Sequence, residues 1–304
     1  MNTKTKFLIA AVMFTAAGSA VNAQGVSGSQ ESGYEIKAGE VTMTVSATEG
    51  GKIMSYKYAG REMLAQSRVP NQYGSTFWTS PQVEWNWPPV NEFDRMEYTL
   101  ISSTPNQLIL QSRVAQKLPF QITKCYTPDP KGRFIRITYT ITNMGSETRQ
   151  VAPWEISRVV SDESGLIFFD APAEQITPAG LIPFKSELGA SWYTFESAQQ
   201  NRKINSDGKG WLAYAVNGLL MIKKFDDIGP SEWAPNEAEI QIYINQGKTY
   251  IELESQGAYK TVAPGESLDW SVDWYMIPYN DDVAPSKKLL KTVNKTIKSS
   301  KKMK

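Results

Sequence analysis

Residues 211–225 read WLAYAVNGLLMIKKF, and this stretch decides the fold class. Two apolar runs flank Asn217-Gly218. A two-residue hairpin turn needs left-handed backbone angles, which Asn and Gly adopt readily, so Asn-Gly between strand-like runs is a strong hairpin signal. The stretch therefore predicts two antiparallel strands. Either Lys223 or Lys224 ends the second strand, and we expect that side chain to be solvated.

Similar strand signals recur along most of the chain. Residues 133–142 (RFIRITYTIT) carry large apolar side chains mainly at alternate positions, which is typical of a half-buried strand. Comparable runs occupy 41–47 and 108–114, and three more follow residue 239. Helical periodicity is almost absent outside the two termini. The pattern predicts an all-β fold, an antiparallel sandwich or barrel, with one domain over residues 34–285.

The N-terminal segment has the features of a secretory signal. Lys4 and Lys6 precede an apolar run over residues 7–18, and small residues lead to Ala23. This order predicts a signal peptide over 1–23, cleavage near Ala23, and export to the periplasm or out of the cell. The run is too short to span a bilayer. The next segment, 24–33 (QGVSGSQESG), is a flexible linker by composition.

The C-terminal segment, 286–304, is basic. It holds eight lysines and no acidic residue, although the whole chain has a net charge of only +1. The body is therefore acidic, which argues against nucleic acid as a partner. Leu289, Leu290, Val293 and Ile297 fall on one helical stripe. We expect an amphipathic helix that docks on the body and continues into a lysine tail, and favour this over contact with a membrane.

The composition excludes several chemistries, because the sequence contains no histidine. Ser-His-Asp and Cys-His catalysis are excluded, as are typical zinc sites and any histidine acid or base. We expect neither a metal nor another cofactor. The remaining carboxylates, tyrosines, arginines and nine tryptophans suit a sugar site, where indole rings stack on C–H faces and polar groups bind hydroxyls.

A tryptophan-rich loop is the candidate stacking platform. Residues 78–89 read WTSPQVEWNWPP. If this loop is extended, Trp85 and Trp87 point to the same face with Asn86 between them. Trp78 follows a strand-like run and is expected in the core. For Trp85 and Trp87 both interpretations stay open, although we favour a platform over core packing.

Four stretches carry a family resemblance. Leu253-Glu254-Ser255-Gln256 and Pro264-Gly265-Glu266 lie within YIELESQGAYKTVAPGESLDWSVDWYM (250–276), and residues 50–64 and 139–160 precede them. Together they resemble the galactose mutarotase (aldose 1-epimerase) superfamily, and most closely an exported bacterial family of unknown function that lacks the catalytic histidines. The resemblance implies a single-domain antiparallel supersandwich.

The resemblance also implies a site. Glu254 stands where the family has its general base, and Trp154 stands at a position of a family histidine. Arg158 lies on the same strand face as Trp154, whereas Glu155 faces away if the strand is regular. The implied sugar-binding residues are Trp85, Asn86, Trp87, Trp154 and Arg158. Alternatively, Glu254 faces solvent together with Glu252 on one face of the strand, and the two carboxylates have no role in a site.

Three functions remain open on the sequence. The first is an exported carbohydrate-binding protein that takes a sugar or an oligosaccharide in a Trp-lined groove. The second is an enzyme, either a sugar epimerase or mutarotase or a lyase, with Glu254 as the base. The third is a non-catalytic sandwich that binds a partner protein through its tryptophans. The oligomeric state is open in all three.

Overall fold

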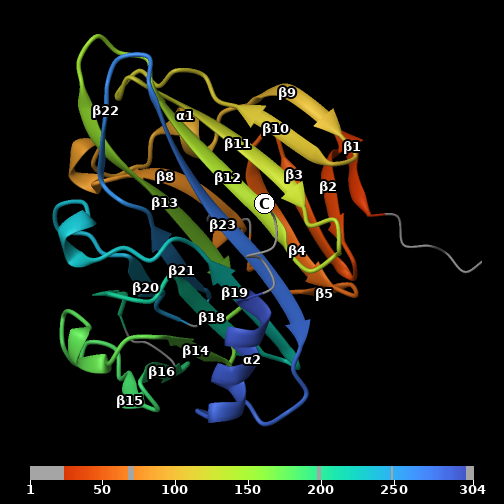
Figure 1. The fold of residues 1–304 in the computed structure, drawn as a ribbon, viewed down its shortest axis with the longest axis vertical. Helices are drawn as coiled ribbons and strands as arrows, with labels where there is room; N and C mark the ends of the chain where they lie inside the picture. The colour runs from red at the N-terminus through yellow and green to blue at the C-terminus, as the bar shows by residue number, and fades with distance from the viewer. Residues whose placement is uncertain (1–23, 68–71, 197–199, 248, 299–304) are drawn as a thin grey trace, which may run out of the picture.

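The computed structural model describes residues 24–67, 72–196, 200–247 and 249–298. The predicted signal peptide, 1–23, lies outside these residues. The described chain consists mainly of two large antiparallel sheets packed face to face (Figure 1). The predicted all-β antiparallel sandwich is therefore confirmed. No helix in the described part is long and apolar enough to cross a bilayer.

The first sheet holds 11 strands, and its central strands carry the site. In spatial order its main path is β1 (Gly25–Ser29), β2 (Gly33–Ala38), β3 (Val41–Ser46), β4 (Lys52–Tyr58), β8 (Ser75–Ser80), β13 (Arg149–Val159), β21 (Ile251–Gln256), β20 (Ile240–Ile244) and β17 (Arg202–Ser206). Off this path lie β5 (Arg61–Glu62) and β22 (Lys260–Val262).

The second sheet holds 10 strands. Their spatial order is β15 (Lys185–Glu187), β16 (Ala190–Thr194), β14 (Leu166–Phe169), β18 (Trp211–Val216), β19 (Leu219–Lys224), β23 (Ser267–Pro278), β12 (Ile135–Asn143), β11 (Phe120–Pro128), β10 (Gln107–Gln111) and β9 (Thr99–Thr104). The remaining elements are short or helical: β6 (Gln66–Ser67), β7 (Gln72–Tyr73), η1 (Gln82–Glu84), η2 (Ala173–Gln175), η3 (Pro230–Glu232), α1 (Asn91–Asp94) and α2 (Lys287–Ile297).

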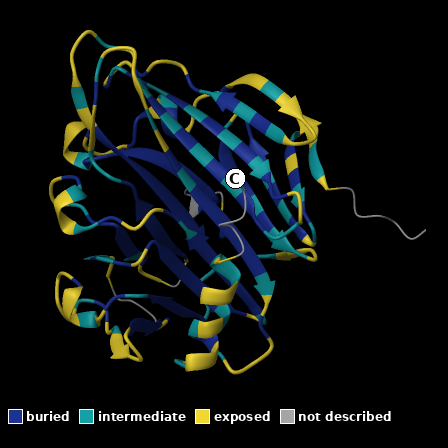
Figure 2. Ribbon diagram, viewed as in Figure 1, coloured by how far each residue is buried: buried dark blue, intermediate teal, exposed yellow. Residues whose placement is uncertain are grey.

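The predicted hairpin joins β18 to β19. Val216 pairs with Leu219, and the turn residues Asn217 and Gly218 have φ angles of 50° and 72°. Both angles are left-handed, as the Asn-Gly signal requires. The alternation predicted for residues 133–142 holds on β12, and the neighbouring β11 also alternates between buried and partly buried positions (Figure 2).

The interior between the sheets is rich in aromatic side chains. Phe77 of β8 stacks on Tyr139 of β12 at 4.3 Å between ring centroids. Tyr56 of β4 meets Trp274 of β23 edge-on at 5.1 Å. These contacts join one sheet to the other, and they fix which face of β8 and β13 points inward. The opposite face of these strands is left for a site.

Helix α2 packs on a second, smaller core. Leu289 and Val293 are buried against side chains such as Phe168, Trp211 and Tyr275. Ser286 caps the helix, because its hydroxyl accepts a hydrogen bond of 3.2 Å from the Leu289 amide. This helix lies inside the segment predicted to be amphipathic, and residues 299–304 lie outside the described residues.

The prediction of a flexible linker over residues 24–33 is wrong. Residues 25–29 form strand β1, which pairs with β2 in register from Gly25–Lys37 to Ser29–Gly33. The Val26 amide also donates to the Pro105 carbonyl at 3.1 Å. Gly and Ser favour disorder only where no neighbouring strand offers hydrogen-bond partners, and here two neighbours do.

Candidate functional site

The sheet register gathers the candidate residues on one face. Residues opposite each other in antiparallel strands share a face. Trp154 of β13 pairs with Trp78 of β8, and Arg158 of β13 pairs with Glu252 of β21. Phe77, on the other face, contacts the second sheet, so Trp78 and its row face outward.

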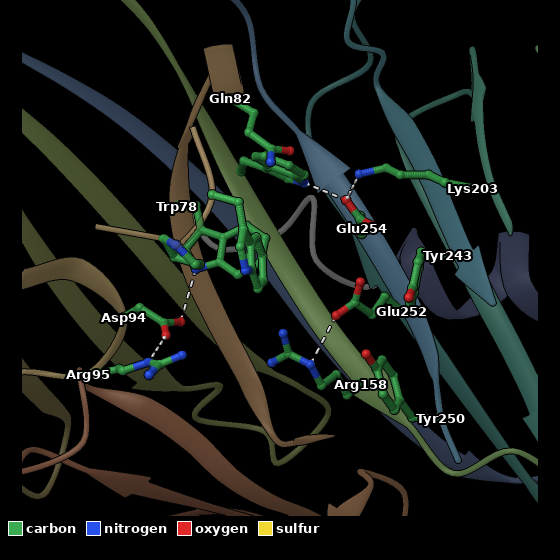
Figure 3. A pocket seen from close by; sticks show the side chains of 13 residues that line it. Trp78, Gln82, Asp94, Arg95, Arg158, Lys203, Tyr243, Tyr250, Glu252 and Glu254 are labelled. Atoms are coloured by element: carbon green, nitrogen blue, oxygen red, sulfur yellow. Dashed lines mark hydrogen bonds and ion pairs between the residues drawn. The ribbon is translucent and has the colours of Figure 1, made fainter. Parts of the chain in front are cut away.

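A cavity of about 450 Å³ lies on this outward face. Its walls come from β8, β13, β21, β20, β17 and from the loop after β8 (Figure 3). The lining residues are Trp78, Gln82, Trp87, Pro89, Asp94, Arg95, Trp154, Arg158, Lys203, Tyr243, Tyr250, Glu252 and Glu254. The volume is within the usual range of small-molecule sites.

Glu254 is buried at the centre of the lining and makes two polar contacts. Its Oε2 accepts a hydrogen bond of 2.8 Å from Trp154 Nε1. The same oxygen lies 2.9 Å from Lys203 Nζ (Figure 3). Lys203 Nζ also stands 4.6 Å from the centre of a Trp154 ring. The Trp154 indole thus contacts the carboxylate directly.

Glu252 lies two residues before Glu254 and faces the same cavity. Its Oε1 is 3.0 Å from Arg158 Nε (Figure 3). Burial raises the pKa of Glu252 to about 7, with Arg158 opposing this effect and the nearby Glu254 adding to it. A carboxyl whose pKa is raised in this way gives up its proton less readily than a free one, which suits a general acid.

Asp94 of α1 closes the opposite side. Its Oδ1 accepts hydrogen bonds from Trp78 Nε1 at 3.0 Å and from Thr76 Oγ1 at 2.8 Å. Its Oδ2 lies 3.2 Å from Arg95 Nε. Burial by itself would raise the pKa of Asp94, but Lys52 and the two hydrogen bonds outweigh it, so the pKa is lowered. Asp94 therefore stays ionised and holds Trp78 in place.

The tryptophan loop does not have the predicted extended form. Trp85 is only 1% exposed, donates from Nε1 to the Thr79 carbonyl at 2.8 Å and packs on Trp78 and Trp154. Trp87 is 67% exposed and lines the cavity. Asn86 has a left-handed φ of 54°, which turns the chain between them. The prediction that Trp85 is a stacking platform is wrong, because its ring is already enclosed by protein.

The structure brings together four of the six predicted site residues. Glu254, Trp154, Arg158 and Trp87 line the cavity, whereas Trp85 is core and Asn86 is exposed outside the lining. Trp78 is buried, as predicted, with 6% of its surface exposed. It also lines the cavity.

Sequence reasoning missed several lining residues. Lys203 and Tyr243 lie on strands whose neighbours in the sheet cannot be read from the sequence. In the structure Tyr243 pairs with Lys203 on one side and with Glu252 on the other. A signal exists in the alternation of IQIYI, which puts Gln241 and Tyr243 on one face. Asp94 and Arg95 lie on a short helix, and no pattern in the sequence marks them.

No group of three or more Asp, Glu or Cys side chains in the described part of the chain is arranged to hold a metal ion. The charged groups of the cavity pair with one another, Arg95 with Asp94, Arg158 with Glu252 and Lys203 with Glu254. Its chemistry is therefore that of paired charges, tyrosines and indole rings.

Comparison with solved structures identifies the fold. A galactose mutarotase-like protein from Lactobacillus casei has a TM-score of 0.59 at 11% identity, and the match covers 80% of this chain and 99% of that one. One from Clostridium acetobutylicum has a TM-score of 0.55 at 10% identity, over 83% and 98%. A galactose mutarotase related enzyme from Lactobacillus acidophilus has a TM-score of 0.55 at 10% identity, over 83% and 100%.

The chain therefore has the galactose mutarotase-like fold, as the motifs around Glu254 predict. At such low identity the likeness shows the fold alone. No protein-family model and no curated protein sequence matches the chain. The finer resemblance to an exported family of unknown function remains a prediction.

Proposed function

We propose that the cavity binds a neutral sugar. The observation that carries this proposal is the combination, in one cavity, of the exposed Trp87 ring with the polar groups of Arg158, Glu252 and Glu254. An indole ring stacks on the C–H face of a pyranose, while charged groups bind its hydroxyls. The galactose mutarotase-like neighbours support a sugar as the class of ligand.

The balance of charges favours a neutral ligand. Three cations line the cavity, and each is paired with a carboxylate of the same lining: Arg95 with Asp94, Arg158 with Glu252, and Lys203 with Glu254. A phosphate or uronate would have to compete with a carboxylate for each cation. Hydroxyl groups accept from one partner and donate to the other, and so fit between paired charges.

The shape of the site favours a small ligand over a partner protein, the third possibility left by the sequence. Trp78, Trp87 and Trp154 converge on a hollow instead of forming a flat apolar patch. Protein interfaces are generally built on flatter surfaces with an apolar centre.

Calorimetric titration with glucose, galactose and mannose tests the proposal. We expect saturable binding to at least one sugar, weakened about fivefold in Trp87→Ala because a stacking contact contributes about 1 kcal/mol. Val83 is 66% exposed on the same loop but lies outside the cavity lining, so Val83→Ala is the matched control. Absence of binding to every sugar would overturn the proposal.

A second candidate, a sugar 1-epimerase activity, is favoured by the pKa of Glu252, about 7, beside Glu254. In this scheme the Glu254 carboxylate takes the proton of the anomeric hydroxyl, while protonated Glu252 gives its proton to the ring oxygen. The C1–O5 bond breaks and leaves the open-chain aldehyde. Rotation about C1–C2 and reversal of both proton transfers close the other anomer.

Proton NMR of freshly dissolved α-galactose and α-glucose tests this candidate. The protein is expected to accelerate anomer exchange, and Glu254→Gln and Glu252→Gln should each abolish the acceleration. If the sugar binds saturably but anomer exchange is no faster than in buffer, the epimerase activity is overturned and the sugar-binding function stands.

We also propose that the protein is exported, on the basis of the predicted signal peptide before Gln24. Mass spectrometry of the protein from a bacterial host, fractionated into cytoplasm and periplasm, tests this. Cleavage near Ala23 in the periplasmic fraction is expected, and uncleaved protein confined to the cytoplasm would contradict it.

A further inference from the structure

A second cavity of about 490 Å³ lies beside the first. The two cavities share Gln82 and Lys203 in their linings, so they meet at these two side chains. Apart from Pro178, the lining of the second cavity is polar and includes Thr177, Asn205 and Asn236. The two cavities therefore adjoin on the outward face of the first sheet.

The sheet register explains why the two cavities adjoin. Glu254 of β21 pairs with Gln241 of β20, and Gln241 pairs with Asn205 of β17. Residues paired in this way point to the same face. One row of side chains therefore runs from Glu254 in the first cavity to the amides of Gln241 and Asn205 in the second.

The amides of the second cavity are held in place by one another. Gln241 Nε2 donates to Asn205 Oδ1 at 2.9 Å and to Glu237 Oε2 at 2.8 Å. Gln256 Nε2 donates to Gln241 Oε1 at 3.1 Å. Side chains fixed by such a network lose little entropy when a ligand binds.

The chemistry of this lining matches a hydroxyl-rich ligand. The network of Gln241 and Asn205 leaves the side-chain amides of Gln82 and Asn236 and the Thr177 hydroxyl, which make no hydrogen bond within the described part of the chain and can meet a ligand. Lys203 and Glu237 are the charged groups of the lining, and Lys203 is already paired with Glu254. An anionic ligand therefore has no uncompensated cation here, whereas the hydroxyls of a neutral sugar unit have several polar partners.

We propose that the second cavity is a subsite for a further sugar unit, so that the ligand is a neutral oligosaccharide. One terminal unit occupies the first cavity, and the chain passes over Lys203 and Gln82 to the unit bound at Asn205 and Asn236. This inference rests on the proposed sugar-binding function of the first cavity. It adds the class of substrate: a chain of at least two units rather than a free monosaccharide.

Two variants at the edge of the second cavity test the subsite. Thr177→Tyr fills it with a ring, and Thr177→Ser is the matched control that keeps the hydroxyl. Asn236→Asp is the second variant, because it removes amide donors while Asp still tolerates the left-handed φ of 64° at this position. Both positions are exposed and lie outside the lining of the first cavity, so the fold and the first cavity are expected to persist.

Calorimetry on the purified protein would compare glucose, galactose and mannose with di- and trisaccharides of each. We expect at least one oligosaccharide to bind tenfold or more tightly than its monosaccharide. Thr177→Tyr and Asn236→Asp should reduce that advantage several-fold, while monosaccharide affinity stays within twofold and Thr177→Ser behaves as wild type.

Other outcomes separate the subsite from the function. If oligosaccharides and monosaccharides bind equally, the subsite is overturned and the sugar-binding function stands. If oligosaccharides bind more tightly but neither Thr177→Tyr nor Asn236→Asp affects them, the chain leaves the first cavity in another direction and the inference also fails. If no sugar binds, the function itself is overturned, and the subsite with it.

Discussion

Glu155 and Glu254 are buried carboxylates on neighbouring strands of one sheet, but they point to opposite faces. Glu155 points inward and contacts three side chains of the other sheet: Lys223 Nζ at 2.9 Å, Tyr139 Oη at 2.6 Å and Trp274 Nε1 at 3.1 Å. Glu254 points outward, to Trp154 and to Lys203.

The two carboxylates differ in the exposure of their cations. The side chains of Glu155 and Lys223 are both 0% exposed, whereas the side chain of Lys203 is 34% exposed. A pair sealed from water on both sides holds the sheets together and has no room for a ligand. A pair with one partner at the wall of a cavity can exchange its contacts with a ligand. The same residue type is thus structural on one face and available for function on the other.

The largest expected effect comes from breaking the inner pair. Glu155→Gln leaves Lys223 as an uncompensated buried cation and should lower the free energy of unfolding by about 3–5 kcal/mol. Chemical denaturation measures this. Glu254→Gln, whose cation reaches water, is the control and should cost about 1 kcal/mol or less. An equal cost for both variants would contradict the distinction between the faces.

The two loop tryptophans extend the comparison to apolar side chains. Trp85→Ala empties a buried site and should lower the free energy of unfolding by about 3 kcal/mol. Trp87→Ala removes an exposed ring, and its cost should stay within about 0.5 kcal/mol. Thermal or denaturant unfolding distinguishes them, and similar losses for both would place Trp87 in the core.

Glu239 provides a third buried carboxyl, which makes no ion pair in the described part of the chain. Burial raises its pKa to about 8, and Asp227 and Asp207 add to this effect. The fold favours the protonated form, so its contribution to stability is complete below the unfolded pKa near 4.5 and is lost as the pH rises through about 8.

Unfolding free energies at pH 5 and pH 9 test this expectation. Wild type should lose on the order of 2 kcal/mol more over this interval than Glu239→Gln, which cannot ionise. If the two proteins show the same dependence on pH, Glu239 is not the group that titrates.

The smallest expected effect concerns the pH dependence of catalysis, if the enzyme of the second candidate exists. The pKa of Glu252, about 7, makes its acid form decline above neutral pH. Anomer exchange should therefore fall a few-fold between pH 6.5 and pH 8, whereas sugar affinity changes less. A rate that rises over this interval would exclude Glu252 as the acid.

The fold was predictable because its signals are local. Alternation in 133–142 and the Asn217-Gly218 turn depend on neighbours in sequence, and both hold in the structure. Strand β1 was missed because its partners, β2 and Pro105, supply the hydrogen bonds that its composition does not indicate.

The site was only partly predictable, for the same reason. Trp154 and Arg158 share a face through the period of two within their strand, which the sequence shows, whereas Glu254 was placed by the family resemblance and joins them through the pairing of β21 with β13. Lys223, one of the two lysines from which a solvated side chain was expected, is wholly buried, because its partner Glu155 lies on a distant strand of the other sheet. Trp85 was misplaced because a short 3₁₀ turn and the left-handed Asn86 rotate the loop.

Calorimetric titration of Glu254→Gln beside wild type tests the central claim most directly, namely that the outward carboxylates form a sugar site. Glu62→Gln is a control for a carboxylate outside the cavity. The account predicts that wild type and Glu62→Gln bind a neutral sugar alike. Glu254→Gln should bind it tenfold or more weakly, with an unfolding free energy within about 1 kcal/mol of wild type. Undiminished affinity in Glu254→Gln, or no binding by wild type, would contradict it.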